Sequence, residues 1–234
     1  MGKEFQKAVI LVTGYYGSGK TSFALSLAER LVKEGRPPAI VDLDVVNPYF
    51  RTFDYREQLQ AEGIRVEAPV YAGTNLDIPA LPPSIDGLIE RATESSPVIL
   101  DLGGDDAGTA VLGRYKAGLL AAWKRDELAV LHLVNFRRAL TPDAQSAVEE
   151  AAAIGAACGF MPTAVINSTN LGPETTGSTL LDSLDEAEAL GRQLGVPVEA
   201  TVMEPAVWQG LTPEQQAKIP RAFLLTRRVK LPWE

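Results

Sequence analysis

A short glycine-rich segment near the start of the chain carries the residues best suited to chemistry. Gly14 is followed by four residues and then by Gly19-Lys20-Thr21. Glycines let the backbone turn so that successive N–H groups point inward at an anion, and a helix that starts there adds the positive end of its dipole. A lysine in that turn supplies a full positive charge, and the next hydroxyl can ligate a divalent cation. The pattern predicts a phosphate-binding loop.

The flanking sequence supports this interpretation. The β-branched residues Val9, Ile10 and Val12 precede the loop and favour a strand, and a helical pattern follows it, which is the context that a P-loop requires. A Rossmann dinucleotide site is the nearest alternative, because Gly17-Ser18-Gly19 gives half of its fingerprint and Asp42 suits the ribose role. The third glycine position holds Ser22, however, and Lys20-Thr21 would have no purpose there. The P-loop is favoured.

The elements that must position this loop alternate between strand and helix along the chain. Apolar runs predict strands at 8–13, 39–44, 64–70, 97–102, 128–134, 163–167 and 196–202. Helices are expected near 19–34, 52–62, 84–94, 107–123, 142–157, 179–194 and 213–226, the fifth with Thr141 as its N-cap. The alternation predicts the α/β P-loop NTPase fold, with a mostly parallel sheet of about seven strands and helices on both faces. Residues 1–234 read as one nucleotide-binding domain.

Polar residues end three of these strands, and ligands of parallel sheets gather at the carboxyl ends of strands. Asp42 and Asp44 are two apart, so they share one side of the second strand at its rim. Asp101 closes an apolar strand and is expected to hold Mg²⁺ directly or through water, and Gly104 is placed to offer its N–H to a γ-phosphate. Asn167 is a candidate for contact with the base, with turn formation as the alternative.

Composition excludes several classes of function. The net charge of −8 argues against broad binding to nucleic acid or anionic membranes, and no apolar run is long enough to span a bilayer. Lys3 and Glu4 lead into the first strand without a signal sequence, so a cytoplasmic protein is expected. The single cysteine, Cys158, and the single histidine, His132, both read as packed core residues. Acid–base chemistry is therefore left to carboxylates or to metal-polarised water.

Three segments together resemble the MinD/ParA class of P-loop ATPases. They are GYYGSGKT, the DLDVVN segment after the second strand and the DLGG end of the fourth strand. The resemblance implies an ATPase that uses Mg²⁺, in which Asp44 positions the attacking water while Asp42 and Asp101, with Thr21, form the metal shell. It also implies that Asn167 contacts adenine.

One position departs from that class. A second, signature lysine follows the first P-loop glycine in the class and reaches the partner's phosphates in an ATP-sandwiched dimer, whereas this chain has Tyr15. A tyrosine donates a hydrogen bond but cannot neutralise phosphate charge. Either Arg51, Arg137 or Arg138 substitutes, or the dimer is weakened. A nucleotide-dependent homodimer is left open, and slow turnover is expected.

The choice of nucleotide can be predicted separately. Guanine-specific P-loop proteins carry Asn-Lys-x-Asp at the strand end where this chain has Asn167-Ser168-Thr169-Asn170. Asn170 offers one acceptor where a carboxylate offers two, and the stacking lysine is missing, so ATP is favoured.

The sequence therefore predicts a slow Mg²⁺-dependent ATPase that acts as a nucleotide switch for an unknown protein partner. Two alternatives remain: a phosphotransferase or ligase similar to dethiobiotin synthetase, with Arg51 and Asp105 lining a substrate pocket, and an ATP-binding regulator that scarcely hydrolyses. The expected catalytic residues are Lys20 and Asp44, and the expected metal ligands are Thr21, Asp42 and Asp101. The residues expected to contact nucleotide are Gly14, Tyr15, Tyr16, Gly17, Ser18, Gly19, Lys20, Thr21, Ser22, Gly104 and Asn167.

Overall fold

The computed structural model describes residues 2–44, 55–67, 84–104, 112–219 and 221–225. They build a sheet of eight strands in the order β3-β2-β4-β1-β5-β6-β7-β8, and every pair of neighbours in it is parallel. The strands are β1 (Val9–Gly14), β2 (Ala39–Leu43), β3 (Arg65–Glu67), β4 (Val98–Leu102), β5 (Leu128–Val134), β6 (Ala164–Asn167), β7 (Val198–Met203) and β8 (Ala222–Leu224). The predicted fold class is confirmed, with one strand more than expected.

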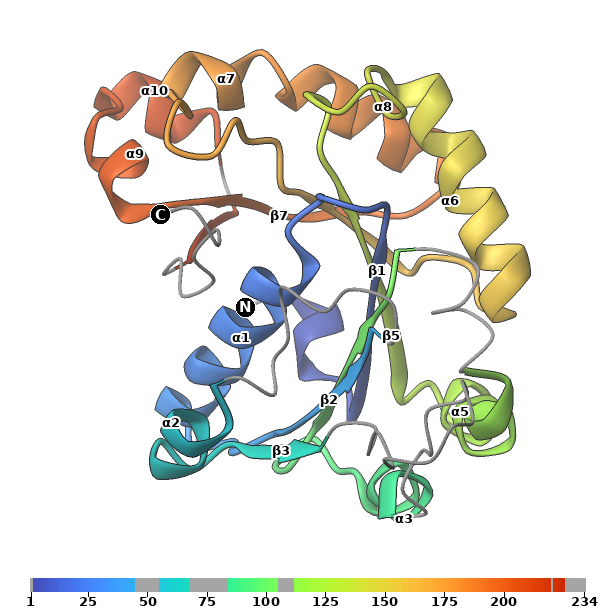
Figure 1. Ribbon diagram of the computed structural model, residues 1–234. Coiled ribbons are helices and arrows are strands. Elements are labelled where there is room, and N and C mark those ends of the chain that lie inside the picture. The colour runs from blue at the N-terminus through green and yellow to red at the C-terminus, as the bar shows by residue number, and fades with distance from the viewer. Residues whose placement is uncertain (1, 45–54, 68–83, 105–111, 220, 226–234) are drawn as a thin grey trace, which may run out of the picture.

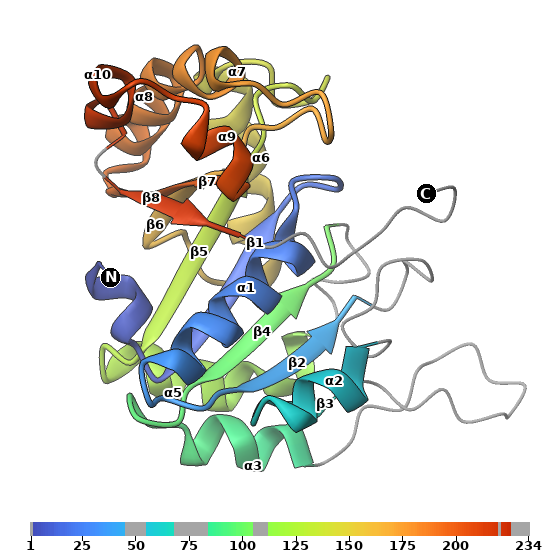
Figure 2. The same ribbon diagram turned by 90° about the vertical axis from the view of Figure 1, so that its left-hand side faces the viewer.

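Helices cover both faces of this sheet (Figure 1). They are η1 (Lys3–Gln6), α1 (Lys20–Lys33), α2 (Arg56–Ala61), α3 (Ser84–Arg91), η3 (Gly113–Tyr115), α5 (Lys116–Lys124), α6 (Ala144–Cys158), α7 (Gly177–Leu181), α8 (Leu184–Leu194), α9 (Pro205–Gln209) and α10 (Pro213–Ala217). One face carries α1 and α2, while α3 and α5 pack on the other, where α6 and α8 continue the layer over β5 and β6. Because β1 lies between β4 and β5, the loop that follows it is at the middle of the carboxyl edge of the sheet (Figure 2).

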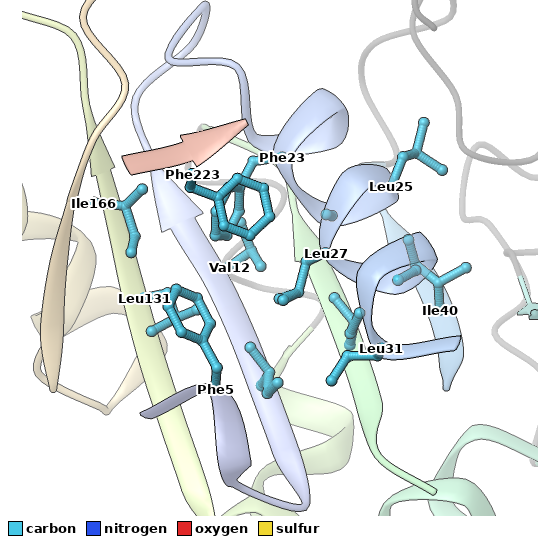
Figure 3. Close-up of a cluster of buried hydrophobic side chains, with 14 of the residues drawn as sticks. Phe5, Val12, Phe23, Leu25, Leu27, Leu31, Ile40, Leu131, Ile166 and Phe223 are labelled. Atoms are coloured by element: carbon cyan, nitrogen blue, oxygen red, sulfur yellow. The ribbon is translucent and has the colours of Figure 1, made fainter. Parts of the chain in front are cut away.

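The core under α1 is built from residues that alternate along the central strands. Val12 of β1 and Leu131 of β5 point to this face and meet the apolar side of α1, as the period of two in a strand requires (Figure 3). Phe23 of α1 packs against Phe223 of β8 with the rings tilted and their centroids 5.1 Å apart, and Phe5 lies 6.1 Å from Phe223. Burial of these rings holds α1, and with it the loop at its start, in a fixed place on the sheet.

The starts of the expected helices 52–62 and 107–123 and the end of the expected strand 64–70 lie outside the described residues. Two other expected helices differ from the structure. The segment 213–226 was expected to be one helix, but α10 ends at Ala217 and Ala222–Leu224 pairs with β7 as an edge strand, because this places Phe223 in the core. The expected helix 179–194 is split into α7 and α8. Ser183 lies at the break, where its buried hydroxyl donates to Leu180 O (2.7 Å) and competes with the helical backbone bonds.

The cap of α6 also differs from the prediction. Asp143, rather than Thr141, is the N-cap residue, and its carboxylate accepts from the Ser146 N–H at 2.8 Å. The Ser146 hydroxyl donates to the same oxygen at 2.8 Å, and the two bonds from Ser146 lower the pKa of the Asp143 carboxyl. The Thr141 hydroxyl instead donates to Asn135 O at 2.9 Å, a contact between two ends of one loop.

The predictions for His132 and Cys158 are confirmed, since both are buried. His132 Nε2 lies 2.9 Å from a carboxylate oxygen of Glu150 on α6, and its Nδ1 lies 3.3 Å from the Thr13 hydroxyl. Burial raises the pKa of the Cys158 thiol, which fits an inert core residue. No helix in the described ranges is both long and apolar enough to cross a bilayer.

A buried phenol gives a first test of this packing. Tyr115 is fully buried, its hydroxyl has no hydrogen-bond partner among the described residues, and burial raises its pKa to about 12. The unfolded state therefore loses this proton at lower pH than the folded state, so the stability falls as the pH rises from about 10 toward about 12. We predict that Tyr115→Phe leaves the free energy of unfolding at pH 7 unchanged or raises it by up to about 1 kcal/mol, and reduces this alkaline loss.

Urea unfolding at pH 7 and at pH 11 measures both effects. Tyr16→Phe, at an exposed tyrosine, is the control and should change neither value. A clear loss of stability in Tyr115→Phe at pH 7 would show that the phenol has a partner.

Candidate nucleotide-binding site

The loop from Gly14 to Gly19 has the geometry of an anion cradle. Gly14, Gly17 and Gly19 have positive φ values of 137°, 75° and 87°, which an L side chain rarely adopts. Gly19 is the N-cap residue of α1, and no side chain of the described residues caps this helix end. The first N–H groups of α1 at Thr21 and Ser22 are therefore available to an anion. Thr21 and Ser22 are half-buried, as expected for residues that line a binding site.

The Lys20 ammonium lies inside this loop. Lys20 is buried, and its Nζ donates to Tyr15 O at 3.1 Å. Gly104, which follows β4, closes the other side: a methyl group built on it would lie 2.7 Å from Tyr16 N and 2.9 Å from Lys20 Nζ. The structure thus brings together the P-loop, its lysine and Gly104, although they are separated by more than eighty positions in the chain.

The two strand-end aspartates meet on neighbouring strands. Asp42 of β2 and Asp101 of β4 are register partners, and both are buried. They alternate with residues of the opposite face, so both side chains belong to the face that α1 covers, where Thr21 lies in the first turn. The three predicted metal ligands therefore lie on one face of the sheet, at its carboxyl edge.

This donor set fits Mg²⁺. Two carboxylates and a hydroxyl are hard oxygen ligands, and Mg²⁺ typically takes only one or two protein carboxylates and completes its octahedron with water and phosphate oxygens. No group of three or more His, Cys, Asp or Glu side chains in the described part of the chain forms a complete metal cage. Thr21, Asp42 and Asp101 would therefore hold the ion together with the nucleotide.

Asp44 follows β2 directly at the rim. Its N–H donates to Asp42 Oδ1 at 3.1 Å, and its side chain is half-buried. Its role in positioning water stays a prediction. Arg51 and Asp105, the other residues considered for this rim, lie outside the described residues.

Asn167 occupies a structural position. It is fully buried; its Nδ2 donates to Ser183 Oγ (2.9 Å), and its Oδ1 accepts from the Thr169 N–H and hydroxyl at 3.2 and 2.7 Å. The carboxamide is thus used to shape the loop after β6. The geometry favours the turn-forming role that the sequence left open over the predicted contact with adenine.

Sequence reasoning missed a set of bonds that ties three loops together. Ser168 Oγ donates to Ser18 O at 2.7 Å, which joins the loop after β6 to the P-loop. The buried Asn135, just after β5, donates from Nδ2 to Asn170 O (3.1 Å), and the Thr169 hydroxyl accepts from Phe136 N (3.2 Å). No local sequence motif predicts these contacts. The sequence shows a run of polar residues after each of two strands, and that pattern does not specify which residues pair.

A cavity of about 380 Å³ extends from the P-loop between these loops. Its polar end is formed by the start of α1, and its far end lies against the loop after β7. The residues that line it are Ser18, Gly19, Ser22, Arg137, Arg138, Ser168, Asn170, Leu171, Gly172, Pro173, Thr175, Val202, Met203, Glu204, Val207 and Leu225. A cavity of this volume that is lined by both polar and apolar residues suits the nucleoside part of a nucleotide whose phosphates lie in the P-loop.

Two tyrosines of the P-loop face outward. Tyr15 and Tyr16 are 36% and 60% exposed, so neither side chain packs in the core. The Tyr15 position, where the MinD/ParA class has a lysine, thus carries a surface phenol and no cation.

Comparison with known proteins gives one relative in sequence and several in structure. No protein-family model matches the chain. The signal recognition particle protein of Mycobacterium leprae is 35% identical over 163 residues, which is 65% of this chain and 28% of that protein. The chain thus spans less than a third of the length of this relative.

Solved structures share the fold. The cell division protein FtsY from Thermotoga maritima superposes with a TM-score of 0.52 at 18% identity, covering 83% of this chain and 61% of that one. FtsY from Elizabethkingia anophelis in complex with GDP gives 0.51 at 19% identity, covering 82% and 56%. A nucleotide-binding protein from Archaeoglobus fulgidus in complex with ADP gives 0.50 at 16% identity, covering 86% and 84%.

These likenesses show that the chain has the α/β fold of P-loop NTPases. They do not single out the MinD/ParA class, to which the sequence resemblance pointed.

Lys20 allows a direct test of the site. We predict that Lys20→Ala weakens nucleotide binding about 10- to 100-fold, because it removes a charge-assisted contact worth roughly 1.5–3 kcal/mol. Titration calorimetry with ATP and with GTP in the presence of Mg²⁺ measures the loss, and circular dichroism checks the fold. Lys33→Ala, at the exposed end of the same helix, should bind as the wild type does. Equal affinity in Lys20→Ala and the wild type would rule out the assigned role.

Gly104, which packs against the P-loop at Tyr16 and Lys20, gives a second test of the site. The added methyl group in Gly104→Ala would lie within 3.0 Å of the Tyr15 backbone and must displace the loop or Lys20. We predict about tenfold weaker nucleotide binding with little change in the far-UV spectrum. Gly113→Ala is the matched control, since a methyl group there meets no described heavy atom within 4 Å. If both variants bind nucleotide equally well, Gly104 is not part of the site.

Proposed function

We propose that the chain is a Mg²⁺-dependent nucleoside triphosphatase that acts as a switch for a protein partner, and that its nucleotide is ATP. The observation that carries this proposal is the convergence of the Lys20 ammonium, the open start of α1 and the Asp42–Asp101 pair at one edge of the sheet. An ammonium and free amide groups suit phosphate oxygens, and two carboxylates suit the metal that accompanies them.

In the proposed reaction a water oxygen attacks the γ-phosphorus as the bond from phosphorus to the β–γ bridging oxygen breaks, and that electron pair stays on the leaving diphosphate. The water releases a proton, and the products are nucleoside diphosphate and inorganic phosphate. Asp44 would orient the water, and Lys20 with the loop N–H groups would stabilise the charge on the transferred group. Thr21, Asp42 and Asp101 would hold Mg²⁺, and this ion would supply further neutralisation of the phosphate charge.

The choice of ATP rests on the loop after β6. A guanine site needs an acceptor for two adjacent N–H donors, and Asn170 does not offer one: its Oδ1 accepts from Gly172 N at 3.1 Å, and its Nδ2 donates to Ser168 O at 2.8 Å. The ADP complex of the Archaeoglobus fulgidus neighbour, which has nearly the same length as this chain, agrees with an adenine nucleotide.

GTP is the alternative that the other comparisons favour. The sequence relative is a signal recognition particle protein, and the Elizabethkingia anophelis FtsY structure contains GDP. Among the described residues that line the cavity, Glu204 is the only acidic one, and its carboxylate is of the kind that guanine N1 and N2 donors prefer. Titration with both nucleotides decides between them: tighter binding of GTP would overturn the choice of ATP and leave the switch proposal standing.

A regulator that binds nucleotide with little hydrolysis is the second candidate function. The exposed Tyr15, with no positive charge at this position, favours slow turnover. Release of phosphate without added substrate separates the two functions, and phosphate release that requires a small-molecule acceptor would instead indicate a phosphotransferase.

Asp44 provides the mutational test of hydrolysis. We predict that Asp44→Asn keeps nucleotide affinity within about twofold and lowers single-turnover hydrolysis by about 100-fold or more, as expected for a group that positions water. Rapid-quench measurement of phosphate release gives the rate. Asp185→Asn, at an exposed position on α8, should hydrolyse as the wild type does. Wild-type turnover in Asp44→Asn would exclude this role.

A further inference from the structure

The Arg138 side chain lies against the P-loop although it comes from the loop between β5 and α6. Its Nε donates to Gly17 O at 3.2 Å. A methyl group built on Gly17 would lie 3.2 Å from Arg138 Nε and 3.3 Å from its Cζ, so the guanidinium covers the side of Gly17 where a side chain would stand. Arg138 also lines the cavity that begins at Gly19 and Ser22. One guanidinium therefore borders both the loop and the cavity.

The backbone that carries Arg138 is held in place before any ligand arrives. Its N–H donates to Asn135 O (3.1 Å), and the Thr141 N–H donates to Arg138 O (3.1 Å). The Thr141 hydroxyl adds a bond to Asn135 O at 2.9 Å. Asn135 is itself tied to the loop after β6, so Arg138 extends from a fixed base and loses little backbone freedom on binding a ligand.

Arg138 also differs from the neighbouring cation in its electrostatic surroundings. The Arg137 guanidinium pairs with Asp182, at 3.4 Å. No carboxylate in the described ranges lies within ion-pair distance of Arg138. Its side chain donates one hydrogen bond to these residues, and the acceptor is the neutral Gly17 carbonyl. Its positive charge is thus uncompensated by these residues, and a guanidinium keeps further N–H donors in a planar fork that matches phosphate oxygens.

We propose that Arg138 binds the polyphosphate of the nucleotide in cis and supplies the positive charge that Tyr15 cannot. This inference rests on the proposed function in that it takes the P-loop as a polyphosphate site, but it depends neither on the base nor on hydrolysis. The guanidinium exchanges its contact with the Gly17 carbonyl for phosphate oxygens, or shares its donors between them.

The test uses three substitutions that separate charge from the contact with Gly17. Arg138→Lys keeps a positive charge, Arg138→Gln keeps a neutral donor for Gly17 O, and Arg138→Ala keeps neither. Arg192→Ala, at an exposed position on α8, is the control. The probes are inorganic tripolyphosphate and ATP with Mg²⁺, measured by calorimetry at low and at moderate salt.

We expect Arg138→Gln and Arg138→Ala to lose about tenfold or more in affinity for both probes, Arg138→Lys to lose less, and Arg192→Ala to bind as the wild type does. The affinity lost in Arg138→Gln should shrink at higher salt, since it arises from charge. Wild-type affinity in Arg138→Gln, with a loss only in Arg138→Ala, would show that Arg138 merely holds Gly17 and would overturn the inference, as would wild-type affinity in all three variants.

These outcomes are separable from the proposed function. If the wild type binds both probes and Lys20→Ala does not, the P-loop assignment stands whatever the Arg138 variants do. If tripolyphosphate binding depends on the charge of Arg138 but no hydrolysis is detected, the inference stands and the hydrolytic part of the proposed function fails. A wild type that binds neither probe overturns both.

Discussion

The placement of one ammonium group inside a glycine turn is the constraint on which the site depends. Lys20 is held between the Tyr15 carbonyl and the backbone at Gly104, and it begins the helix whose aromatic contacts with Phe223 anchor it to the sheet. A buried ammonium is costly unless its donors find partners. Polyphosphate oxygens supply such partners, so the geometry that positions Lys20 also makes the loop a site for an anion.

The surrounding loops act as one unit rather than as independent ends of strands. Ser168 joins the loop after β6 to the P-loop, and Asn135 joins it to the loop after β5, from which Arg138 returns to Gly17. A ligand that shifts any one of these loops must strain bonds to the other two. This coupling is a physical route by which occupancy of the phosphate site can alter the positions of the loops after β5 and β6.

Much of this arrangement could be predicted from the sequence, because its signals are local. The buried strands are continuous apolar runs, the P-loop has fixed spacing, and the aspartates follow their strands directly, so the edge at which Asp42 and Asp101 meet was foreseeable. The rest depends on contacts between distant segments. The edge strand β8 forms because it places the Phe223 ring in the core. The Asn167 side chain donates to the Ser183 hydroxyl, and no short segment of the sequence reveals this contact. The same holds for Asn135, whose role is to join two loops.

A crystal structure with a non-hydrolysable ATP analogue and Mg²⁺ tests the central claim most directly. The account predicts the phosphates against the N–H groups from Tyr15 to Ser22, with Lys20 Nζ on the terminal phosphates and the metal between Thr21 and the Asp42–Asp101 pair. An analogue bound elsewhere on the molecule, or phosphates in the loop with the metal remote from both aspartates, would contradict it.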